Sequence, residues 1–479
     1  LYIIEDSTFN KSATLDIESK LIEYMHADQK YTLQNGNGGL RNHNYYNKKY
    51  YKQLFEKIWE RLIVEQVAQN SIKDIENSDL FKYSPFKSLT TDQSDIVESL
   101  ETIITSNNKS VNIIKGEPGS GKTILAIYLV KYLLSQEKTQ HLKIGLVLPQ
   151  TSLRETVRKT FRHVKGLKTN MVLGPNDVVN EPDTFDVLIV DEAHRLTQRR
   201  NLANYSTYDS ACEKLDLNPI DSSQLDWMLQ KSKHSVFLYD EKQTVKPSDV
   251  DKKVFDKIKK AANEYVLSSQ LRVLAGNEFV DYIDSIFRKT DTEFKEFKGY
   301  DFFLYDDIQE MIDQIQIKDS IHGLCRVVAG YSWDWVSKDD PQKYDICIDG
   351  QKLRWNSTVK DWINSPNSIN EVGCIHTVQG YDLNYIGVII GNEISFKDNK
   401  FYFHPENYKD RYGKHSSLNK EEIITYIINI YKTLITRGIR GAYVFVCNDG
   451  LREHLRKYIP STKQDNVLMA AEPEVGYGK

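Results

Sequence analysis

The stretch Val111-Asn-Ile-Ile-Lys115-Gly116-Glu-Pro-Gly-Ser-Gly121-Lys122-Thr123 decides the fold of this chain. It begins as a short β-rich run and continues as the pattern G-x-x-x-x-G-K-[ST], whose glycines let backbone N–H groups wrap phosphates. Residues 122–134, which begin with the last two residues of this stretch, have a helical pattern. This pattern places a helix N-terminus at the phosphates. Strand, loop and helix together predict a nucleotide site built from Gly116, Gly119, Ser120, Gly121, Lys122 and Thr123.

The chemistry expected of this loop follows from its last two residues. Lys122 can reach the β and γ phosphate oxygens, and the Thr123 hydroxyl can bind Mg²⁺. A second signal, Asp186-Val-Leu-Ile-Val-Asp191-Glu192-Ala193-His194, is a buried strand that ends in two acids. In P-loop enzymes the first acid holds Mg²⁺ and a neighbour can activate water. We therefore predict that Asp191 holds the metal, that Glu192 activates the attacking water, and that the cofactors are ATP and Mg²⁺.

The chain around these signals alternates short apolar runs with helical patterns. Such runs are typical of strands buried on both faces of a parallel sheet, and the alternation is typical of α/β folds. The pattern divides the chain into an N-terminal piece, 1–88, and two α/β domains in tandem, 89–272 and 273–479. The strands are expected at 111–115, 144–148, 187–190, 236–239 and 265–267, and then at 323–328, 372–375, 385–390 and 442–447.

The N-terminal piece has a different pattern. A strand-like start at 1–4 precedes a helical spacing at 15–25, and a second helix is expected at 47–69. The Gly/Asn-rich segment 34–39 between them predicts a loop, because Gly and Asn favour positive φ. This region is expected to be small and mainly helical.

Composition narrows the class of protein. The net charge of −4 excludes a wholly basic nucleic-acid coat but not a basic groove on a neutral body. No apolar run approaches the roughly 20 residues that span a bilayer, so no membrane association is expected. The five scattered cysteines argue against a disulfide framework or a zinc site and fit a cytoplasmic location. The chain starts at Leu1 rather than Met, so we expect its natural N-terminus to be missing.

Further short motifs, in their order along the chain, resemble those of superfamily 1 helicases. Val236-Phe-Leu-Tyr-Asp240-Glu-Lys-Gln243 resembles motif III, with Tyr239 in place of Gly, and superfamily 2 would show Ser-Ala-Thr there. The remaining matches are Leu89-Thr-Thr-Asp-Gln93 to the adenine-reading Q motif, Leu148-Pro149-Gln150 to motif Ia, Ser269-Gln270-Leu271-Arg272 to motif IV, Ile375-His376-Thr-Val-Gln379-Gly380-Tyr-Asp382 to motif V, and Thr436-Arg437-Gly438 to motif VI. The string as a whole looks like the bacterial Schlafen group-3-like DNA/RNA helicase domain.

This resemblance implies two tandem RecA-like P-loop domains with parallel sheets, and NTP hydrolysis at the cleft between them. It implies catalytic roles for Gln243, Arg272 and Arg437, the two arginines acting on the γ-phosphate. It further implies nucleotide contacts from Gln93, Gln379, Gly380 and Asp382. Leu271 stands where many relatives place an adenine-stacking Tyr, which puts base selectivity in doubt.

Single-stranded DNA or RNA is the partner that the resemblance implies. Aromatic side chains can stack on bases, but Trp at two-residue spacing is also typical of one face of a core strand. The candidate strand contacts are Pro149, Gln150, Arg154, Lys246, and Trp333 and Trp335 of the Tyr331–Trp335 segment.

The segment from Asn10 to Ile22 resembles the helix of GIY-YIG nucleases that carries the metal-binding Glu. Only Glu18 carries over, as a nuclease metal ligand, because the other strings of that domain do not occur here. The chain as written is not expected to cut nucleic acid, and the alternative is an accessory domain that packs on the helicase. A nuclease domain or partner would fit either case.

Two classes of function remain in competition. The leading hypothesis is an ATP-dependent helicase or single-strand translocase, the motor of a nuclease or antiphage defence protein; the defence role is only an association of the family. The alternative is a regulatory ATPase switch that controls an attached GIY-YIG nuclease without unwinding. A binding module without hydrolysis is disfavoured, because Lys122, Asp191, Glu192 and both arginines are present.

Overall fold

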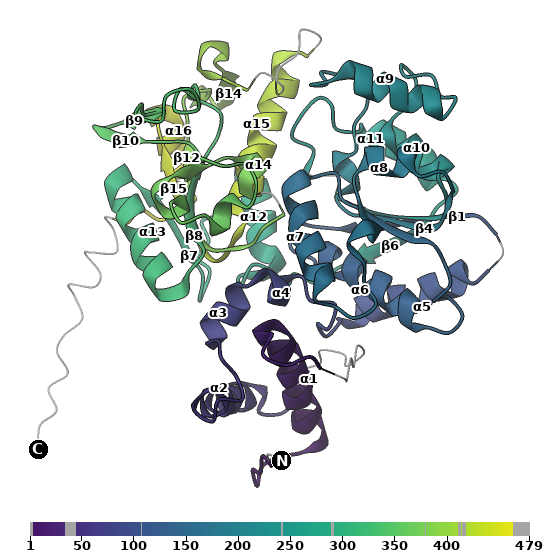
Figure 1. The fold of residues 1–479 in the computed structure, drawn as a ribbon. Helices are drawn as coiled ribbons and strands as arrows, with labels where there is room; N and C mark the ends of the chain where they lie inside the picture. Colours follow the sequence, from purple (N-terminus) through teal and green to yellow (C-terminus); the bar gives the residue numbers. More distant parts are fainter. Residues whose placement is uncertain are drawn as a thin grey trace, which may run out of the picture. The chain divides into compact units, whose positions relative to one another are not determined.

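The computed structural model describes residues 3–33, 45–106, 108–240, 243–288, 292–378, 380–410, 413 and 418–462. The chain forms two compact units (Figure 1). The first unit comprises residues up to 199, 204–241 and 249–269, and the second comprises 200–203, 242–248 and the chain from 270 onward. Within the described ranges, no helix combines the length and the hydrophobicity that crossing a bilayer requires.

The first unit is built on a six-stranded sheet in the order β3-β2-β4-β5-β1-β6. Every strand pair in it is parallel, as the sequence predicts. Its strands are β1 (Ser110–Gly116), β2 (Ile144–Val147), β3 (Val172–Leu173), β4 (Phe185–Val190), β5 (Ser232–Tyr239) and β6 (Asn263–Leu267). The edge strand β3 was not predicted, because a two-residue strand leaves no pattern to detect.

Helices lie on both sides of this sheet (Figure 1). Alternate residues of β5 point to opposite faces: Val236 and Leu238 join the core with α5, α6 and α7, whereas the Phe237 ring packs edge-on against Phe255 of α11. Such two-sided burial is what makes parallel strands read as continuous apolar runs. The helices of the sheet region are α5 (Thr91–Ile104), α6 (Lys122–Ser135), α7 (Thr151–Arg162), α8 (Pro175–Asn180), α9 (Tyr205–Lys214), α10 (Gln224–Gln230) and α11 (Lys252–Lys259).

The N-terminal piece belongs to the same compact unit and is helical, as expected. Its helices are α1 (Lys11–Asp28), α2 (Lys48–Val64), α3 (Ile72–Asn77) and α4 (Asp79–Lys82), around a core that includes Tyr24, Phe55 and Trp59. The strand-like start is wrong for residues 3 and 4, which form no strand. The predicted loop 34–39 lies outside the described residues. The division at residue 88 stays a prediction.

The second unit has a five-stranded sheet in the order β11-β8-β12-β15-β7, again parallel throughout. Its strands are β7 (Asp301–Tyr305), β8 (Cys325–Ala329), β11 (Val372–Gly373), β12 (Leu383–Ile390) and β15 (Gly438–Val446), and two antiparallel hairpins pair β9 (Ile346–Ile348) with β10 (Gln351–Leu353) and β13 (Ile394–Lys397) with β14 (Lys400–Phe403). The predicted strand 372–375 is too long, because α14 begins at Ile375. Strand β7 was missed, although its apolar run is visible in the sequence.

Two cores flank this second sheet. Side chains of α12 and α15 pack on one face with Ile386 and Val388 of β12, and side chains of α13 pack on the other with Ile389. Gly387 of β12 lies under α13, where an added Cβ would meet Ile315 at 3.1 Å. The helices are α12 (Gly276–Arg288), α13 (Ile308–His322), α14 (Ile375–Val378), α15 (Lys420–Ile435) and α16 (Asp449–Leu455).

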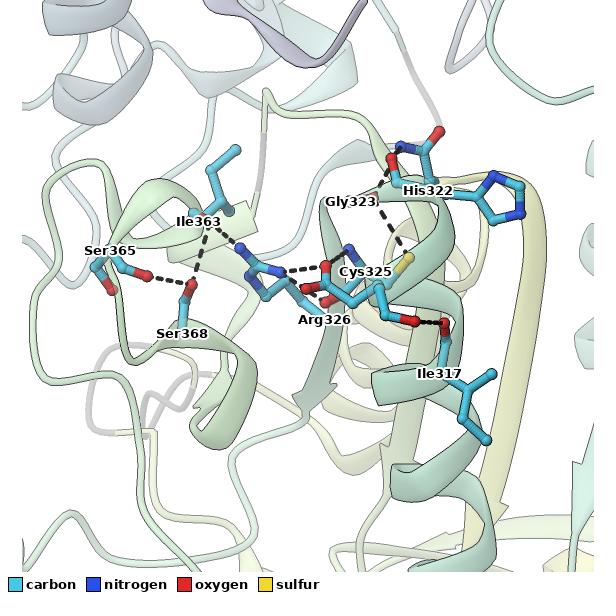
Figure 2. Close-up of polar contacts among 11 residues, drawn as sticks. Ile317, His322, Gly323, Cys325, Arg326, Ile363, Ser365 and Ser368 are labelled. Carbon is cyan, nitrogen blue, oxygen red and sulfur yellow. Dashed lines mark hydrogen bonds and ion pairs between the residues drawn. The ribbon is translucent and has the colours of Figure 1, made fainter. Parts of the chain in front are cut away.

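Arg326 of β8 holds the segment that leads into β11. Its guanidinium donates to the carbonyl oxygens of Ile363, at 2.5 Å, and Cys325, at 2.8 Å, and to the carboxylate of Asp319, at 2.9 Å (Figure 2). The Ser368 hydroxyl donates to the same Ile363 carbonyl at 3.2 Å. Burial lowers the pKa of Arg326, but a guanidinium remains charged, so this group keeps its donors for the loop.

Candidate nucleotide-binding site

The phosphate-binding loop lies between β1 and α6, where the sequence predicts it. Gly119 and Gly121 have φ angles of +86° and +81°, a backbone region that residues other than Gly rarely adopt. A Cβ on Gly116 would lie 2.4 Å from the Ser120 hydroxyl oxygen, so the loop closes too tightly for any other residue. Because α6 begins directly after this loop, the free N–H groups of its first turn lie where phosphates can bind.

The Lys122 side chain is folded onto this loop. Its ammonium donates to the carbonyl oxygen of Gly116 at 2.6 Å and to that of Glu117 at 2.9 Å. Asp240 Oδ2, at the end of β5, lies 3.5 Å from the same ammonium, and both side chains are buried. Lys122 is therefore held at the loop by oxygens of the protein, in the place where phosphate oxygens would bind it.

Thr123 and Asp191 lie together at the carboxyl ends of β1 and β4. The Thr123 hydroxyl donates to Asp191 Oδ2 at 2.6 Å. Asp191 Oδ1 is buried and has no hydrogen-bond partner within the part of the chain that the structure describes. Burial, and then the nearby charge of Glu192, raise the pKa of Asp191 to about 7. A hydroxyl and a buried carboxylate are ligands that Mg²⁺ accepts, so the residues present fit the metal implied by the sequence.

Glu192 occupies a strained turn directly after β4. Its φ angle is +49°, which is uncommon for a residue with a side chain and is typical of functional sites. Its Oε2 atom lies 2.8 Å from Nε2 of the buried His194. Arg195, the residue after His194, forms a buried ion pair with Asp249 at 2.8 Å, and this ion pair supports the turn. The strained turn therefore places Glu192 directly beside Asp191 at the end of β4.

Gln93 connects the Q-motif segment to the phosphate-binding loop. It forms a capping box with Thr90 at the start of α5, and its amide donates to the Ser120 carbonyl at 3.3 Å. Only 1% of Gln93 is exposed. The contact between Gln93 and the nucleotide, which the motif implies, stays a prediction.

The neighbouring Asp92 was not singled out from the sequence. Its Oδ2 accepts hydrogen bonds from the Ser268 backbone N–H, at 3.0 Å, and hydroxyl, at 3.2 Å. Burial raises the pKa of Asp92, but hydrogen bonds from Thr90 and Ser268 outweigh it, so that the net pKa is lowered. The only sequence signal for this contact was the position of Asp92 inside the Q motif, because Ser268 lies far along the chain.

In the second unit, Arg272 and Asp382 form an ion pair through Nε and Oδ1, which joins motif IV to motif V. Arg437 follows α15, and 1% of this residue is exposed. Gln243 is also buried. Gly380 has a φ angle of +89°, whereas Gln379 lies outside the described residues. The predicted roles of these residues in catalysis and nucleotide binding stay predictions.

The predicted strand contacts of motif Ia follow β2 and lead into α7. Pro149 and Gln150 form the turn, and the Arg154 guanidinium donates to the Leu148 carbonyl at 3.1 Å and to the Thr151 hydroxyl at 3.2 Å. Burial lowers the pKa of Arg154. Arg154 therefore supports its own loop, a role that the sequence did not indicate. Lys246 is half-buried in the second unit.

The aromatic segment of the second unit is half-buried. Trp333 and Trp335 pack against the α13 core, and the Trp333 ring lies 6.5 Å from that of Trp355. The Tyr331 ring lies 5.9 Å from the ring of His376, in motif V. The segment thus serves the core on one side, and base stacking on the other stays a prediction.

Glu18 lies exposed on α1 of the N-terminal piece. In the described ranges, no three side chains among His, Cys, Asp and Glu form a group that could hold a metal ion. The role of Glu18 as a nuclease ligand stays a prediction.

Comparison with known proteins agrees with the motifs. The family model described as "Schlafen group 3, DNA/RNA helicase domain" matches residues 109–448. This chain belongs to the Schlafen group 3 helicase family. The match spans both sheets, including the phosphate-binding loop, Asp191 and Arg437, and it begins after the N-terminal piece. Membership of a helicase family places this Schlafen-type chain among proteins that bind and hydrolyse nucleotides, and it confirms the resemblance drawn from the motifs.

The Schlafen-type chain is also similar to "Uncharacterized protein YPL245W" of Saccharomyces cerevisiae. The two are 28% identical over 398 residues, which cover 73% of this chain and 84% of the yeast protein. Two solved helicases overlap it loosely. One is from a study of DNA unwinding at forked double-stranded DNA by two coordinating Pif1 helicases, with 12% identity, a TM-score of 0.31, and coverage of 80% of this chain and 97% of that one. The other is arterivirus nonstructural protein 10, a helicase, with DNA, with 12% identity, a TM-score of 0.28, and coverage of 72% and 63%. Both overlaps are too loose to assign residues or ligands.

Proposed function

We propose that this protein is an ATP-dependent helicase or translocase that acts on single-stranded DNA or RNA. The observation that carries the proposal is the cluster at the ends of β1 and β4, where Thr123, Asp191 and Glu192 meet beside the phosphate-binding loop. Family membership supports the nucleic-acid partner, because the family is one of DNA/RNA helicase domains.

The residues of the cluster divide the work of hydrolysis. Thr123 and Asp191 would hold Mg²⁺, which neutralises charge on the phosphates when it is bound. Lys122 exchanges the Gly116 and Glu117 carbonyl oxygens for phosphate oxygens. Glu192, at its strained turn after β4, accepts the proton of the attacking water.

Two arginines complete the proposed chemistry. Arg272 and Arg437 supply cations that stabilise the charge developing on the γ-phosphate. For Arg272 this role requires exchange of its present partner, because its guanidinium is paired with Asp382. A change of partner during turnover is the kind of step that can connect hydrolysis to movement along a strand.

The test is the rate of ATP hydrolysis with and without single-stranded DNA and RNA. A motor gives strand-stimulated turnover, and its strand affinity weakens steeply with salt, because phosphate contacts release counterions. Lys122→Ala serves as the control that removes turnover under all conditions. A rate that is indifferent to DNA and RNA of several lengths would overturn the motor.

One observation favours a second candidate, a regulatory ATPase switch that controls an attached GIY-YIG nuclease without unwinding. His26 of α1 lies with its Nε2 atom 3.3 Å from the carbonyl oxygen of His163, at the end of α7. The N-terminal piece therefore contacts the helix that follows motif Ia. A switch predicts that His26→Ala changes basal turnover in the absence of any strand, whereas a motor predicts that this variant keeps its strand stimulation.

A further inference from the structure

A fully buried carboxyl group lies in the second unit, at the carboxyl ends of two neighbouring strands. Glu393 follows β12, and 1% of it is exposed. Ser332, just after β8, donates its hydroxyl to Glu393 Oε2 at 2.5 Å and accepts the Glu393 backbone N–H at 3.1 Å. The Tyr431 hydroxyl of α15 donates to the other carboxyl oxygen, Oε1. One carboxyl group thus joins three elements of the unit.

Two glycines give this cluster its space. A Cβ on Gly330 would lie 2.1 Å from the Tyr431 hydroxyl oxygen, and a Cβ on Gly391 would lie 2.3 Å from Ser332 Cβ. The Gly391 backbone N–H also donates to the Tyr431 hydroxyl oxygen at 3.0 Å. A glycine therefore follows directly after β8 and after β12, at positions where the Cβ of any other residue would collide with the cluster.

The stability of the fold does not account for a buried acid. Taking a carboxyl group out of water costs free energy, and apolar residues of the same volume are often at least as stable. Burial raises the pKa of Glu393, in keeping with that cost. What the carboxyl group adds is geometry, because its two oxygens fix the Ser332 and Tyr431 hydroxyls relative to one another.

Two of the three elements that meet at Glu393 lead to a proposed working part. Ser332 lies inside the Tyr331–Trp335 segment, a candidate for stacking on bases. Tyr431 lies in the last turns of α15, and Arg437 follows the end of that helix. Tyr331 also faces His376 of motif V across 5.9 Å. The cluster is therefore a direct polar link between the aromatic segment and the helix that precedes Arg437.

We propose that Glu393 and Tyr431 are positioning residues that connect the Tyr331–Trp335 segment to α15, so that a strand bound at the segment changes the position of Arg437. This inference rests on the proposed function, because it requires a strand and a hydrolysed nucleotide. It assigns no chemical step to Glu393 or Tyr431. Both residues act through their neighbours, and their removal breaks the link without removing either end.

The experiment compares Tyr431→Phe and Glu393→Gln with the wild type, using the whole chain. Both substitutions are nearly isosteric, and Tyr426→Phe on the same helix is the matched control. We expect basal ATP hydrolysis within about twofold of the wild type in all three. Stimulation by oligo-dT or oligo-U should fall at least about fivefold in the two cluster variants, the lower end of common coupling strengths.

A second measurement does not depend on turnover. Coupling between the binding of two ligands is reciprocal, so if a strand changes the affinity for the nucleotide, a non-hydrolysable ATP analogue must shift the wild type's affinity for a labelled oligonucleotide by the same factor. Fluorescence anisotropy with and without the analogue should show this shift in the wild type and Tyr426→Phe, and its loss in Tyr431→Phe and Glu393→Gln. A purely structural role would lower the melting temperature and leave the shift in place.

The outcomes separate the two proposals. If no strand stimulates the wild type, the proposed motor falls, and this inference falls with it. If strands stimulate the wild type and both cluster variants equally, and the analogue shifts affinity in all of them, only the inference is overturned. Loss of stimulation in both variants, with the melting temperature of the control, supports it.

Discussion

Lys122 Nζ lies 3.5 Å from Asp240 Oδ2, which brings the phosphate-binding loop and the end of β5 together. The two residues are far apart in the chain but close in space, because β1, which precedes the loop, pairs in parallel with β5, which precedes Asp240. The carboxyl ends of parallel strands meet at one edge, and this edge is where α/β proteins bind ligands. The pair therefore places Asp240, which belongs to the segment that resembles motif III, at the proposed nucleotide site.

Lys122→Ala should abolish ATP hydrolysis, because no other side chain of the loop carries a positive charge to the phosphates. The measurement is steady-state turnover together with binding of a fluorescent ATP analogue. Lys138→Ala, an exposed lysine after α6, is the control and should behave as the wild type. Turnover that survives in Lys122→Ala would contradict the assignment of the site.

Glu192→Gln should keep ATP binding and lose turnover, since the amide has the same shape but cannot accept the water's proton. General bases contribute about 10²- to 10⁴-fold, and we expect a loss in this range. Single-turnover kinetics would separate the chemical step from product release. Glu155→Gln on α7 is the matched control. Near-wild-type turnover in Glu192→Gln would assign the base elsewhere.

The parts of this site that can be predicted from the sequence are those whose residues are close together in the chain. The loop from Gly116 to Thr123 and the pair Asp191 and Glu192 are contiguous motifs, and the structure places them after β1 and after β4, the two strands that flank β5 in the sheet. Strand β11 was predicted too long because Thr377 caps the next turn: its hydroxyl accepts the Cys374 N–H at 2.9 Å. A local hydroxyl contact of this kind ends a strand without altering the apolar run.

Contacts between distant segments could not be predicted, because they depend on strand order. The sequence gives no register between Asp92 and Ser268, or between Glu393 and Tyr431. Nor does it show that Gly330 and Gly391 leave the space that Tyr431 and Ser332 require. Arg154 was predicted to contact the strand, and the structure turns its guanidinium onto its own loop. Side-chain direction is decided by packing, which periodicity does not report.

Arg437→Ala should lower kcat about 10³-fold, as is typical when an arginine finger is removed. Because Arg437 is buried, we also expect a lower melting temperature. Arg437→Lys separates the two effects, since it keeps the charge but not the planar fork of donors. The lysine variant should regain stability more than kcat. Arg440→Ala, three residues on, is the control for both measurements.

His26 should make a contribution to the stability of the first unit that is lost as pH falls, opposite in sign to the contribution of Asp191, whose raised pKa favours the folded state as pH falls. Burial lowers the pKa of His26 from its ordinary value of 6.5. Its contacts, the His163 carbonyl and the Phe86 ring, include no acid that would favour the charged form. The unfolded chain then binds more protons than the folded chain as pH falls through about 6.5, so the free energy of unfolding decreases. The stabilisation is complete above this pH and is lost below it.

Urea unfolding at about pH 7.5 and pH 5.5 measures this effect, the interval in which an ordinary histidine titrates. His26→Gln keeps a donor for the His163 carbonyl but cannot titrate, so between these two pH values its free energy of unfolding should fall less, or rise more, than that of the wild type. His141→Gln, at an exposed site, should leave the difference as in the wild type. An unchanged difference in His26→Gln would mean that His26 is not kept neutral by burial. His234, whose pKa burial also lowers, accounts for part of the remaining dependence.

Arg154 and Lys246 should respond differently to replacement, although the sequence suggests the same strand contact for both. Lys246→Ala should weaken strand affinity and reduce the salt slope by about 1, the signature of a lost phosphate contact. Arg154→Ala should also lower the melting temperature, because its guanidinium bonds the Leu148 carbonyl and packs against Gly174. Fluorescence anisotropy over a range of salt concentrations measures the slope, and thermal unfolding measures the stability. If the slope is unchanged in Arg154→Ala while the melting temperature falls, Arg154 supports the loop and does not contact the strand; an unchanged slope in both variants would move the proposed strand path away from these residues.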